Sequence, residues 1–496
     1  MDMKSLVLFN SLSGEKESFK PLIEGRIGLY VCGPTVYNDV HLGNCRTFVS
    51  FDTIFRYLIH LGYKVRYVRN ITDVGHLLDD GEDRMMKGAR LEQLQPMEIA
   101  QKYSNGFHQM MQVFNTLPPS IEPRATGHII EQIEMVEAIL ERGFAYERNG
   151  SVYFDTIKFV EAKNPYGQLS GRIIEDLLSE SRDNLKNQDE KKHPSDFALW
   201  IKASDEHIMR WNSPWSVGFP GWHLECSAMS TKYLGEHFDI HGGGNDLKFP
   251  HHENEIAQNV GACGCSPANY WLHTNMLLLN GRKMSKSEGN TISPAELFTG
   301  NSTHITRAYS PMVVRFFFMQ AHYRSTLDIT DEALQAADKA YRRLMESMRI
   351  LSQWKDPFSA SKGSKDDEVK AAMAQCYDDM NDDFNVPKSL ASIFELTGII
   401  NSIKDGHLPN DSISALCWSE LKTHLQHFVF DIYGLQDENT SSQSGTVDNL
   451  MHLIITLRND ARTRKDFPMS DKIRDGLKNA GIQLKDGKEG TEWTYL

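Results

Sequence analysis

The sequence predicts an α/β fold built on a parallel sheet, interrupted by an inserted module and followed by helical segments. Three observations support this prediction: an early strand–helix–strand pattern, a polar stretch in the middle of the chain, and a helix-rich composition after Asp328. The chain has 496 residues, too many for one compact core, so about three domains are expected. Apolar residues make up 40% of it, which excludes a disordered protein.

The strand–helix–strand pattern lies near the N-terminus. Residues 27–32 are a short apolar run that ends at a Gly-Pro turn and predicts a buried strand. Apolar residues then recur at helical spacing over 48–58, Gly62 ends the helix, and residues 64–71 predict a second strand. Such a unit implies a parallel sheet. It lacks the G-x-G-x-x-G motif, so it is not a standard dinucleotide-binding fingerprint.

Changes in composition divide the rest of the chain. A helix is expected over 129–140 and a strand over 150–154, and the polar residues 172–192 are expected to be exposed. A loop between helices is expected at 360–368 and a flexible linker at 436–446. The predicted parts are an α/β domain in two halves, 1–117 and 211–275, an insert at 118–210, a lysine-loop region at 276–327, helices at 328–435 and a small unit at 447–496.

Charge and cysteine content narrow the class of protein. The net charge of −13 excludes a uniformly cationic protein but does not exclude local basic patches, and residues 447–496 carry nine Lys/Arg against eight Asp/Glu. Seven cysteines, an odd number, favour reduced thiols or metal ligands over a disulfide framework. The sequence shows neither a cleavable signal nor a long apolar span, so a cytoplasmic protein with no membrane partner is expected.

Two motifs predict a phosphate-binding site. The segment KMSKSEGN at 283–290 places Lys283 and Lys286 beside two hydroxyls and a glycine, as a mobile anion clamp would require. Taken alone, a segment of this kind is more often a solvated surface loop. The segment HLGN at 41–44 lies between the first strand and its helix, where helix N-terminal amides face the edge of the sheet. There His41 could donate to phosphate oxygens, Gly43 would let a nucleotide approach, and Asn44 could instead cap the helix.

A third group of residues has the pattern of metal ligands. His251 and Glu255 are four positions apart and would be neighbours on a helix, as are Trp222 and Cys226 if their segment is helical. Cys32 ends the first strand at the same edge of the sheet. Cys32, Cys226, His251 and Glu255 could therefore form a tetrahedral site; the alternative is buried cysteines and a surface His/Glu pair. Cys263 and Cys265 are either a second metal-binding pair or ordinary thiols of a loop.

Taken together, HLGN and KMSKS resemble the signature pair of class I aminoacyl-tRNA synthetases, with Asn44 where that family usually has His. With YVCGPTVY at 30–37, RNITD at 69–73 and GKEGTEW at 487–493, the chain resembles the cysteinyl-tRNA synthetases from end to end. The resemblance implies a Rossmann-type parallel-sheet catalytic domain split by a connective insert, then an α-helical bundle and a small C-terminal anticodon-binding domain.

The resemblance also implies an activity and its residues. The expected reaction activates L-cysteine with ATP and Mg²⁺ to cysteinyl-adenylate, releases pyrophosphate, and transfers cysteine to the 3′-terminal adenosine of tRNA(Cys). The expected enzyme is a monomer that holds one Zn²⁺. The implied sites are catalytic His41, Lys283 and Lys286; ATP-binding His41, Gly43, Asn44, Gly242, Gly243, Gly244 and Lys286; cysteine-binding Thr72, Trp222 and Asp246; zinc-binding Cys32, Cys226, His251 and Glu255; and tRNA-binding Arg462, Arg464, Asp486 and Trp493.

A zinc ion would explain how such an enzyme distinguishes cysteine from serine. Serine differs from cysteine by one atom, and packing differences of that size are worth only about 1–3 kcal/mol. A zinc ion binds thiolate strongly, whereas a serine hydroxyl is far too basic to be deprotonated there, so no separate editing site is implied. Two other functions remain open: a ligase that joins cysteine to an amino-sugar, and a non-catalytic RNA-binding protein stabilised by zinc.

Overall fold

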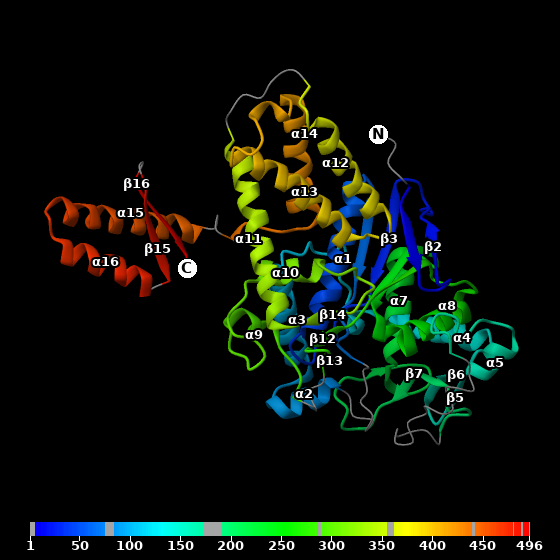
Figure 1. The fold of residues 1–496 in the computed structure, drawn as a ribbon. Helices are drawn as coiled ribbons and strands as arrows, with labels where there is room; N and C mark the ends of the chain where they lie inside the picture. The colour runs from blue at the N-terminus through cyan, green and yellow to red at the C-terminus, as the bar shows by residue number, and fades with distance from the viewer. Residues whose placement is uncertain are drawn as a thin grey trace. The chain divides into compact units, whose positions relative to one another are not determined.

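The computed structural model describes residues 5–74, 84–172, 190–284, 289–354, 362–438, 442–479, 481–487 and 490–495 (Figure 1). The chain forms two compact units, Met1–Leu435 and Gln436–Leu496, and each is described by itself. None of the described helices combines the length and the apolar character that crossing a bilayer requires.

A four-stranded sheet forms the centre of the first unit. Its strand order is β11 (Ala268–Thr274), β10 (Phe238–Gly244), β3 (Arg26–Val31) and β4 (Lys64–Arg69), and every neighbouring pair is parallel. Helix α1 (Leu42–His60) connects β3 to β4, which confirms the predicted α/β fold and its strand–helix–strand unit. A small hairpin of β1 (Val7–Asn10) and β2 (Glu15–Ser18) precedes the sheet.

Close packing between α1 and β10 depends on a glycine. A Cβ atom at Gly242 would lie 2.2 Å from Cζ of Phe51, a fully buried residue of α1. The helix can therefore approach the strand only because position 242 has no side chain. This contact brings the N-terminus of α1 to the carboxyl edge of the sheet, where ligands of open α/β sheets bind.

The inserted region forms its own antiparallel sheet. The strand order is β5 (Ala145–Arg148), β6 (Ser151–Phe154), β7 (Phe197–Lys202), β9 (Val217–Pro220) and β8 (Trp211–Asn212). Together with α4 (Ile129–Glu141), it confirms the predicted helix and strand of this region. Strands β8 and β9 lie beyond residue 210, so the sheet continues past the boundary predicted for the insert because β9 pairs with β7. Residues 173–189 of the predicted polar stretch lie outside the described residues.

The remaining helices of the first half cover these sheets. They are α2 (Arg84–Glu92), α3 (Pro96–Val113), α5 (Thr156–Glu161), α7 (Trp222–Leu234) and α8 (Glu253–Cys263). Short helical turns precede α4 at Ala125–His128 and precede α8 at Asn245–Leu247 and Lys248–His252. Helices α7 and α8 pack side by side (Figure 1), and α7 also contacts β3 and β4 of the central sheet.

A small three-stranded sheet lies between the central sheet and the C-terminal helices of this unit in the order of the chain. It contains β13 (Arg282–Lys283), β12 (Leu277–Leu279) and β14 (Leu327–Ile329), and helices α9 (Pro294–Thr299) and α10 (Pro311–Met319) lie between β13 and β14 in the chain. Strand β12 runs antiparallel to β13 and parallel to β14.

The helical segment predicted after Asp328 is confirmed. It contains α11 (Asp331–Gln353), α12 (Asp366–Asn381), α13 (Val386–Lys404) and α14 (Ala415–Gln426), with short turns at Asn410–Ser412 and His427–Ile432. The loop predicted at 360–368 is wrong for residues 366–368, because α12 already begins at Asp366. The Asp-Asp-Glu run that suggested a loop occupies the first helical turn, where acidic side chains interact favourably with the helix dipole.

The second unit contains α15 (Ser442–Thr463), α16 (Phe467–Asn479), β15 (Ile482–Gly487) and β16 (Gly490–Tyr495). The two strands form an antiparallel hairpin. Helix α15 begins inside the segment predicted as a flexible linker, so that prediction is wrong from Ser442 onward. Serine and aspartate are typical both of linkers and of helix starts, so composition alone did not separate the two.

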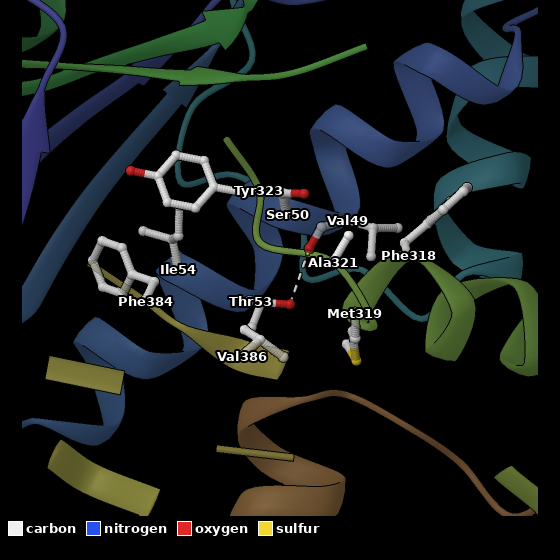
Figure 2. A pocket seen from close by; sticks show the side chains of 10 residues that line it. All are labelled: Val49, Ser50, Thr53, Ile54, Phe318, Met319, Ala321, Tyr323, Phe384 and Val386. Carbon is white, nitrogen blue, oxygen red and sulfur yellow. Dashed lines mark hydrogen bonds between the residues drawn. The ribbon is translucent and has the colours of Figure 1, made fainter. Parts of the chain in front are cut away.

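A pocket of about 20 Å³ lies where α1 meets α10 and the start of α13 (Figure 2). Its lining is mainly apolar, and the hydroxyl of Thr53 is already used, because it donates to the carbonyl of Val49 at 3.1 Å. This volume suits about one water molecule. The pocket therefore belongs to the packing of the core and offers no room for a substrate.

Candidate metal centre and nucleotide site

The four predicted metal ligands meet beside the carboxyl edge of the central sheet. Their ligand atoms all lie within 4.8 Å of one another, and all four side chains are buried. Cys32 Sγ lies 3.6 Å from Cys226 Sγ and 3.5 Å from Glu255 Oε1. A tetrahedral site with metal–sulfur bonds of about 2.3 Å separates two sulfurs by about 3.8 Å. The four side chains therefore form a candidate site for one metal ion.

Local structure explains how these side chains meet. Cys32 follows directly after β3, and Cys226 lies on α7, whose helical form was the condition for the prediction. His251 and Glu255 are one helical turn apart, with 3.1 Å between Nε2 and Oε1. The indole of Trp222 stacks on the His251 ring at 4.4 Å between centroids. One turn of α7 thus supplies a ligand and a side chain that fixes another ligand.

The electrostatics of the cluster favour a bound cation. Burial raises the pKa of the Cys32 thiol well above its ordinary value, and the adjacent Cys226 and Glu255 raise it further. Burial likewise raises the pKa of the Cys226 thiol. Two thiolates and a carboxylate in a buried space repel one another and lack water, so they need a positive charge between them. The donor set of two sulfurs, one nitrogen and one oxygen suits a divalent metal that accepts thiolate ligands.

The nucleotide motif lies at the start of α1. His41 is the residue that caps this helix, and its Nδ1 accepts a hydrogen bond from the backbone N–H of Asn44 at 3.3 Å. The alternative that Asn44 caps the helix is therefore wrong. A Cβ atom at Gly43 would lie 2.9 Å from His41 Nδ1, so glycine allows the ring to fold back over the helix end. Because Nδ1 accepts, the ring proton of the neutral imidazole is on Nε2.

The lysine motif follows a tight hairpin. Strands β12 and β13 are joined by Asn280 and Gly281, whose φ angles of 51° and 74° suit a turn of the type that joins twisted strands. The N–H of Gly281 donates to both carboxylate oxygens of Asp328 at 2.9 Å. Lys283 ends β13 and is exposed. Lys286 lies outside the described residues.

Comparison of the sequence with known proteins shows which family the chain belongs to. A family model described as "tRNA synthetases class I (C) catalytic domain" matches residues 18–339, and a DALR domain model matches residues 375–430. The chain is 52% identical over 493 residues to the cysteine--tRNA ligase of Bacteroides thetaiotaomicron, covering 98% of each chain. The chain belongs to the cysteine--tRNA ligase family. The ligase of Cytophaga hutchinsonii is 51% identical over the full length of both chains, and that of Deinococcus radiodurans is 46% identical, covering 99% of this chain and 96% of the other.

The fold of this cysteine--tRNA ligase family member is shared with more distant proteins. A solved structure of Mycobacterium tuberculosis methionyl-tRNA synthetase in complex with methionyl-adenylate matches it with a TM-score of 0.56 at 14% identity. The match covers 82% of this chain and 89% of the other. At this identity the similarity concerns the fold alone.

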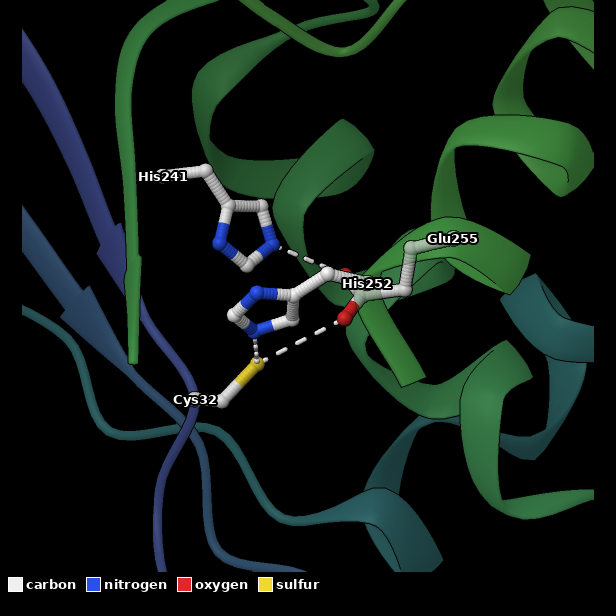
Figure 3. Close-up of side chains that lie close together, drawn as sticks. All are labelled: Cys32, His241, His252 and Glu255. Carbon is white, nitrogen blue, oxygen red and sulfur yellow. Dashed lines mark hydrogen bonds and ion pairs between the residues drawn. The ribbon is translucent and has the colours of Figure 1, made fainter. Parts of the chain in front are cut away.

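A second ligand group, which sequence reasoning missed, shares two residues with the first. It contains Cys32, His241, His252 and Glu255 (Figure 3). His241 Nε2 lies 2.8 Å from Glu255 Oε2, and His252 Nε2 lies 3.3 Å from Cys32 Sγ. Because His251 contacts the other carboxylate oxygen, Glu255 is held at both oxygens. In this family member His241 and His252 therefore orient the candidate ligands Glu255 and Cys32, as hydrogen bonds to ligand residues do at many metal centres.

Further imidazoles extend this arrangement. His252 Nδ1 lies 2.8 Å from His273 Nε2, and His223 Nδ1 lies 2.9 Å from His251 Nδ1. Burial lowers the pKa of His252 and of His273 well below the usual value, and it lowers the pKa of His223 to about 3. These three rings are therefore neutral, which is the form of imidazole that accepts hydrogen bonds or binds metals. Only His251 of these residues was singled out from spacing, since the other contacts join elements distant in sequence.

The three predicted ATP-binding glycines each face a protein side chain. Gly242 faces Phe51, as described above, while a Cβ atom at Gly243 would lie 2.8 Å from His252 Cε1. At Gly244 a Cβ atom would lie 2.3 Å from Asp246 Oδ1. Packing within the protein therefore accounts for the absence of side chains here. Their contact with the adenylate stays a prediction.

The residues predicted to bind cysteine differ in their exposure. Thr72 is buried, and its hydroxyl accepts a hydrogen bond from Asn70 Nδ2 at 3.1 Å. Asn70 in turn accepts from the backbone N–H of Gly33 at 2.8 Å and lies 3.6 Å from Cys226 Sγ, which connects Thr72 to the metal cluster. Trp222 is half-buried and Asp246 is exposed. Cys263 and Cys265 belong to neither of the two candidate metal-binding groups found among the described residues.

The residues predicted to bind tRNA all lie in the second unit. Arg462 is in the last turn of α15, and Arg464 follows that helix. Asp486 and Trp493 lie on the two strands of the hairpin, where Asp486 is opposite Thr491 and Trp493 is opposite Leu484. These placements do not test a contact with RNA, which stays a prediction.

Proposed function

We propose that this chain is a cysteine--tRNA ligase that recognises cysteine through zinc held by Cys32, Cys226, His251 and Glu255. It activates L-cysteine with ATP and Mg²⁺, releases pyrophosphate, and transfers cysteine to the 3′-terminal adenosine of tRNA(Cys). The observation that supports this most directly is the buried Cys₂-His-Glu cluster at the sheet edge that also carries the helix capped by His41. We further propose that it acts as a monomer in the cytoplasm.

Zinc chemistry explains how such an enzyme would distinguish cysteine from serine. When bound, the ion supplies a strong preference for thiolate and makes deprotonation of a thiol at neutral pH easy. The role of the protein is to hold the donor set in a space from which water is excluded. Trp222 and His241 fix His251 and Glu255, respectively, so the position of the ion does not depend on the substrate.

The proposed chemistry of activation needs positioning and charge neutralisation. The cysteine carboxylate attacks the α-phosphorus of ATP, the bond to the β-phosphate oxygen breaks, and pyrophosphate leaves. His41 Nε2–H donates to a phosphate oxygen, since its Nδ1 is already held by the N–H of Asn44. Lys283 and Lys286 neutralise the charge that develops on the leaving group. Thr72, Trp222 and Asp246 would orient the amino acid.

The presence of the second unit favours tRNA over an amino-sugar as the acceptor. An amino-sugar ligase with this catalytic core would have no use for an anticodon-binding unit, whereas Gln436–Leu496 is present as a separate compact unit. Two features of the sequence argue against a non-catalytic RNA-binding protein: His41 is present, and the lysine motif at 283–287 is intact. Arg462, Arg464, Asp486 and Trp493 are the proposed contacts to tRNA, through charge, hydrogen bonding and stacking.

The test is aminoacylation of tRNA(Cys) with cysteine and, separately, with serine. We expect charging with cysteine alone, loss of charging after treatment with a zinc chelator, and recovery when zinc is restored. The metal content of the same samples, measured by atomic emission, links the loss to the ion. Undiminished charging by metal-free protein would contradict the zinc-based recognition, and absence of charging by the zinc-loaded protein would contradict the whole proposal.

A further inference from the structure

Arg46 is a buried cation one turn into α1, the helix that His41 caps. Its side chain has only 1% of its surface exposed, although it carries a full positive charge. In the described part of the chain, its guanidinium donates four hydrogen bonds, all to backbone carbonyls. The acceptors are Asn275 (2.9 Å), Met276 (2.9 Å), His322 (3.3 Å) and Ser325 (2.5 Å).

The four carbonyls belong to two segments that are distant in sequence, 275–276 and 322–325. Two of them come directly before β12, and two come shortly before β14, the strand that pairs with β12. Strand β12 continues into the hairpin whose second strand ends at Lys283. We call the pair β12 and β13 the lysine hairpin, because it ends at Lys283. One guanidinium therefore connects the capped end of α1 to the start of β12 in this hairpin and to the segment before β14, the other neighbour of β12. The neighbouring Thr47 adds a contact to the same region, with 2.8 Å between its Oγ1 and that of Thr274.

The charge of Arg46 is unusual because the four hydrogen-bond acceptors around its guanidinium are neutral carbonyls. Burial lowers the pKa of Arg46 to about 10, and among the described residues its buried Nε atom has no hydrogen-bond partner. By contrast Arg315, also fully buried, donates from Nη2 to the carboxylate of Asp52 at 2.5 Å. A buried cation without an anion costs stability that a neutral residue would not. Only the rigid fork of a guanidinium, however, can donate to four carbonyls in two segments at once.

We propose that Arg46 is a positioning residue for adenylate formation, fixing the lysine hairpin relative to His41. This inference rests on the proposed function, in which His41 and Lys283 act on the same triphosphate. Both groups must be placed together, because a displacement of about 1 Å in such an arrangement can cost about 100-fold in rate. Arg46 touches neither substrate in this proposal and acts only through the two segments that it holds.

The test compares Arg46→Lys with the wild-type protein in cysteine-dependent ATP–pyrophosphate exchange. Lysine keeps the charge but has no planar fork, so it cannot reach both pairs of carbonyls. Active sites are counted by the burst of adenylate formation, which corrects for any unfolded fraction. We expect kcat per active site to fall by about 10-fold or more, with the KM for cysteine and the zinc content unchanged within about twofold.

The matched control is Arg315→Lys, which alters an equally buried arginine on α10 that bonds to Tyr433, Phe114 and Asp52 instead. We expect it to lower the melting temperature and to leave kcat per active site unchanged. Wild-type kcat in Arg46→Lys, or an equal fall in Arg315→Lys, would overturn the proposal. If Arg46→Lys does not fold, Arg46→Gln, which keeps two donors, is measured in the same way with the same criterion. Lack of exchange by the wild-type protein would instead contradict the proposed function.

Discussion

At the candidate metal site, contacts between neighbouring side chains hold the proposed ligands in place. Glu255 is contacted at one oxygen by His251 and at the other by His241, so its carboxylate cannot rotate freely. Cys32 is contacted by Cys226 on one side and His252 on the other. Such fixed ligands bind a metal more tightly than mobile ones, since little conformational entropy is lost on binding.

The first residue-scale prediction concerns Cys226. Replacing it with alanine removes one of two thiolates from the proposed zinc set, so Cys226→Ala should lose tightly bound zinc when dialysed against a mild chelator that wild type withstands. Metal content per chain is the measurement. Cys376→Ala is the control, since Cys376 is equally buried but lies on α12 near the carbonyl of Ser389. Retention of one zinc by Cys226→Ala would remove Cys226 from the ligand set.

At the scale of elements, helix termini and close approaches determine where the site forms. Helix α1 starts at Leu42, where the imidazole of His41 accepts the N–H of Asn44, so the side chain that we propose as a phosphate ligand also caps the helix. The hairpin of β12 and β13 turns at two residues with positive φ angles, which fixes where Lys283 emerges. Both elements then depend on the packing of α1 for their relative position.

The packing of α1 on β10 yields a prediction of stability. In Gly242→Ala the added methyl group would overlap the ring of Phe51, and overpacking of this kind costs about 1–3 kcal/mol. Denaturant unfolding should show this loss in the free energy of unfolding. Gly398→Ala on α13 is the control, because in the described part of the chain the new methyl group meets no atom within 4 Å outside its own stretch of helix, and alanine favours a helix by up to about 1 kcal/mol. Equal stability of the Gly242→Ala variant and wild type would show that α1 can move away from β10 without cost.

At the scale of the whole molecule, the division into two units predicts which activities separate. The metal cluster, His41 and Lys283 all lie in Met1–Leu435, and the proposed tRNA contacts all lie in Gln436–Leu496. A chain ending at Leu435 should therefore keep zinc and cysteine-dependent ATP–pyrophosphate exchange within a fewfold of wild type, while its charging of tRNA(Cys) falls strongly.

Both activities of the shortened chain are measured on one preparation, and its melting temperature shows whether the first unit remains folded. Arg462→Ala in the full chain is the companion variant, since it should weaken tRNA charging alone. Undiminished charging by the chain ending at Leu435 would mean that the second unit makes no contribution to tRNA binding.

Much of this protein could be predicted from its sequence. Hydrophobic periodicity predicted the strand–helix–strand unit, and a helix-rich composition predicted the helices after Asp328, because both signals depend on neighbours only a few residues away. The spacing of His251 and Glu255, and of Trp222 and Cys226, predicted helical pairs for the same reason. Resemblance to a family then joined Cys32 to Cys226, which is 194 positions away, and the fold brings their sulfur atoms to 3.6 Å from each other.

Only the tertiary structure decided the contacts that depend on how the strands are ordered. Strands β3 and β10 are neighbours in the sheet although about 200 residues separate them, and this brings His241 and His252 to Glu255 and Cys32. The same long-range packing places Phe51 against Gly242, and Arg46 against the base of the lysine hairpin. The amino-acid pattern alone therefore established the fold class, the family and the four candidate ligands. The supporting contacts needed the fold, because they join segments whose proximity no local pattern encodes.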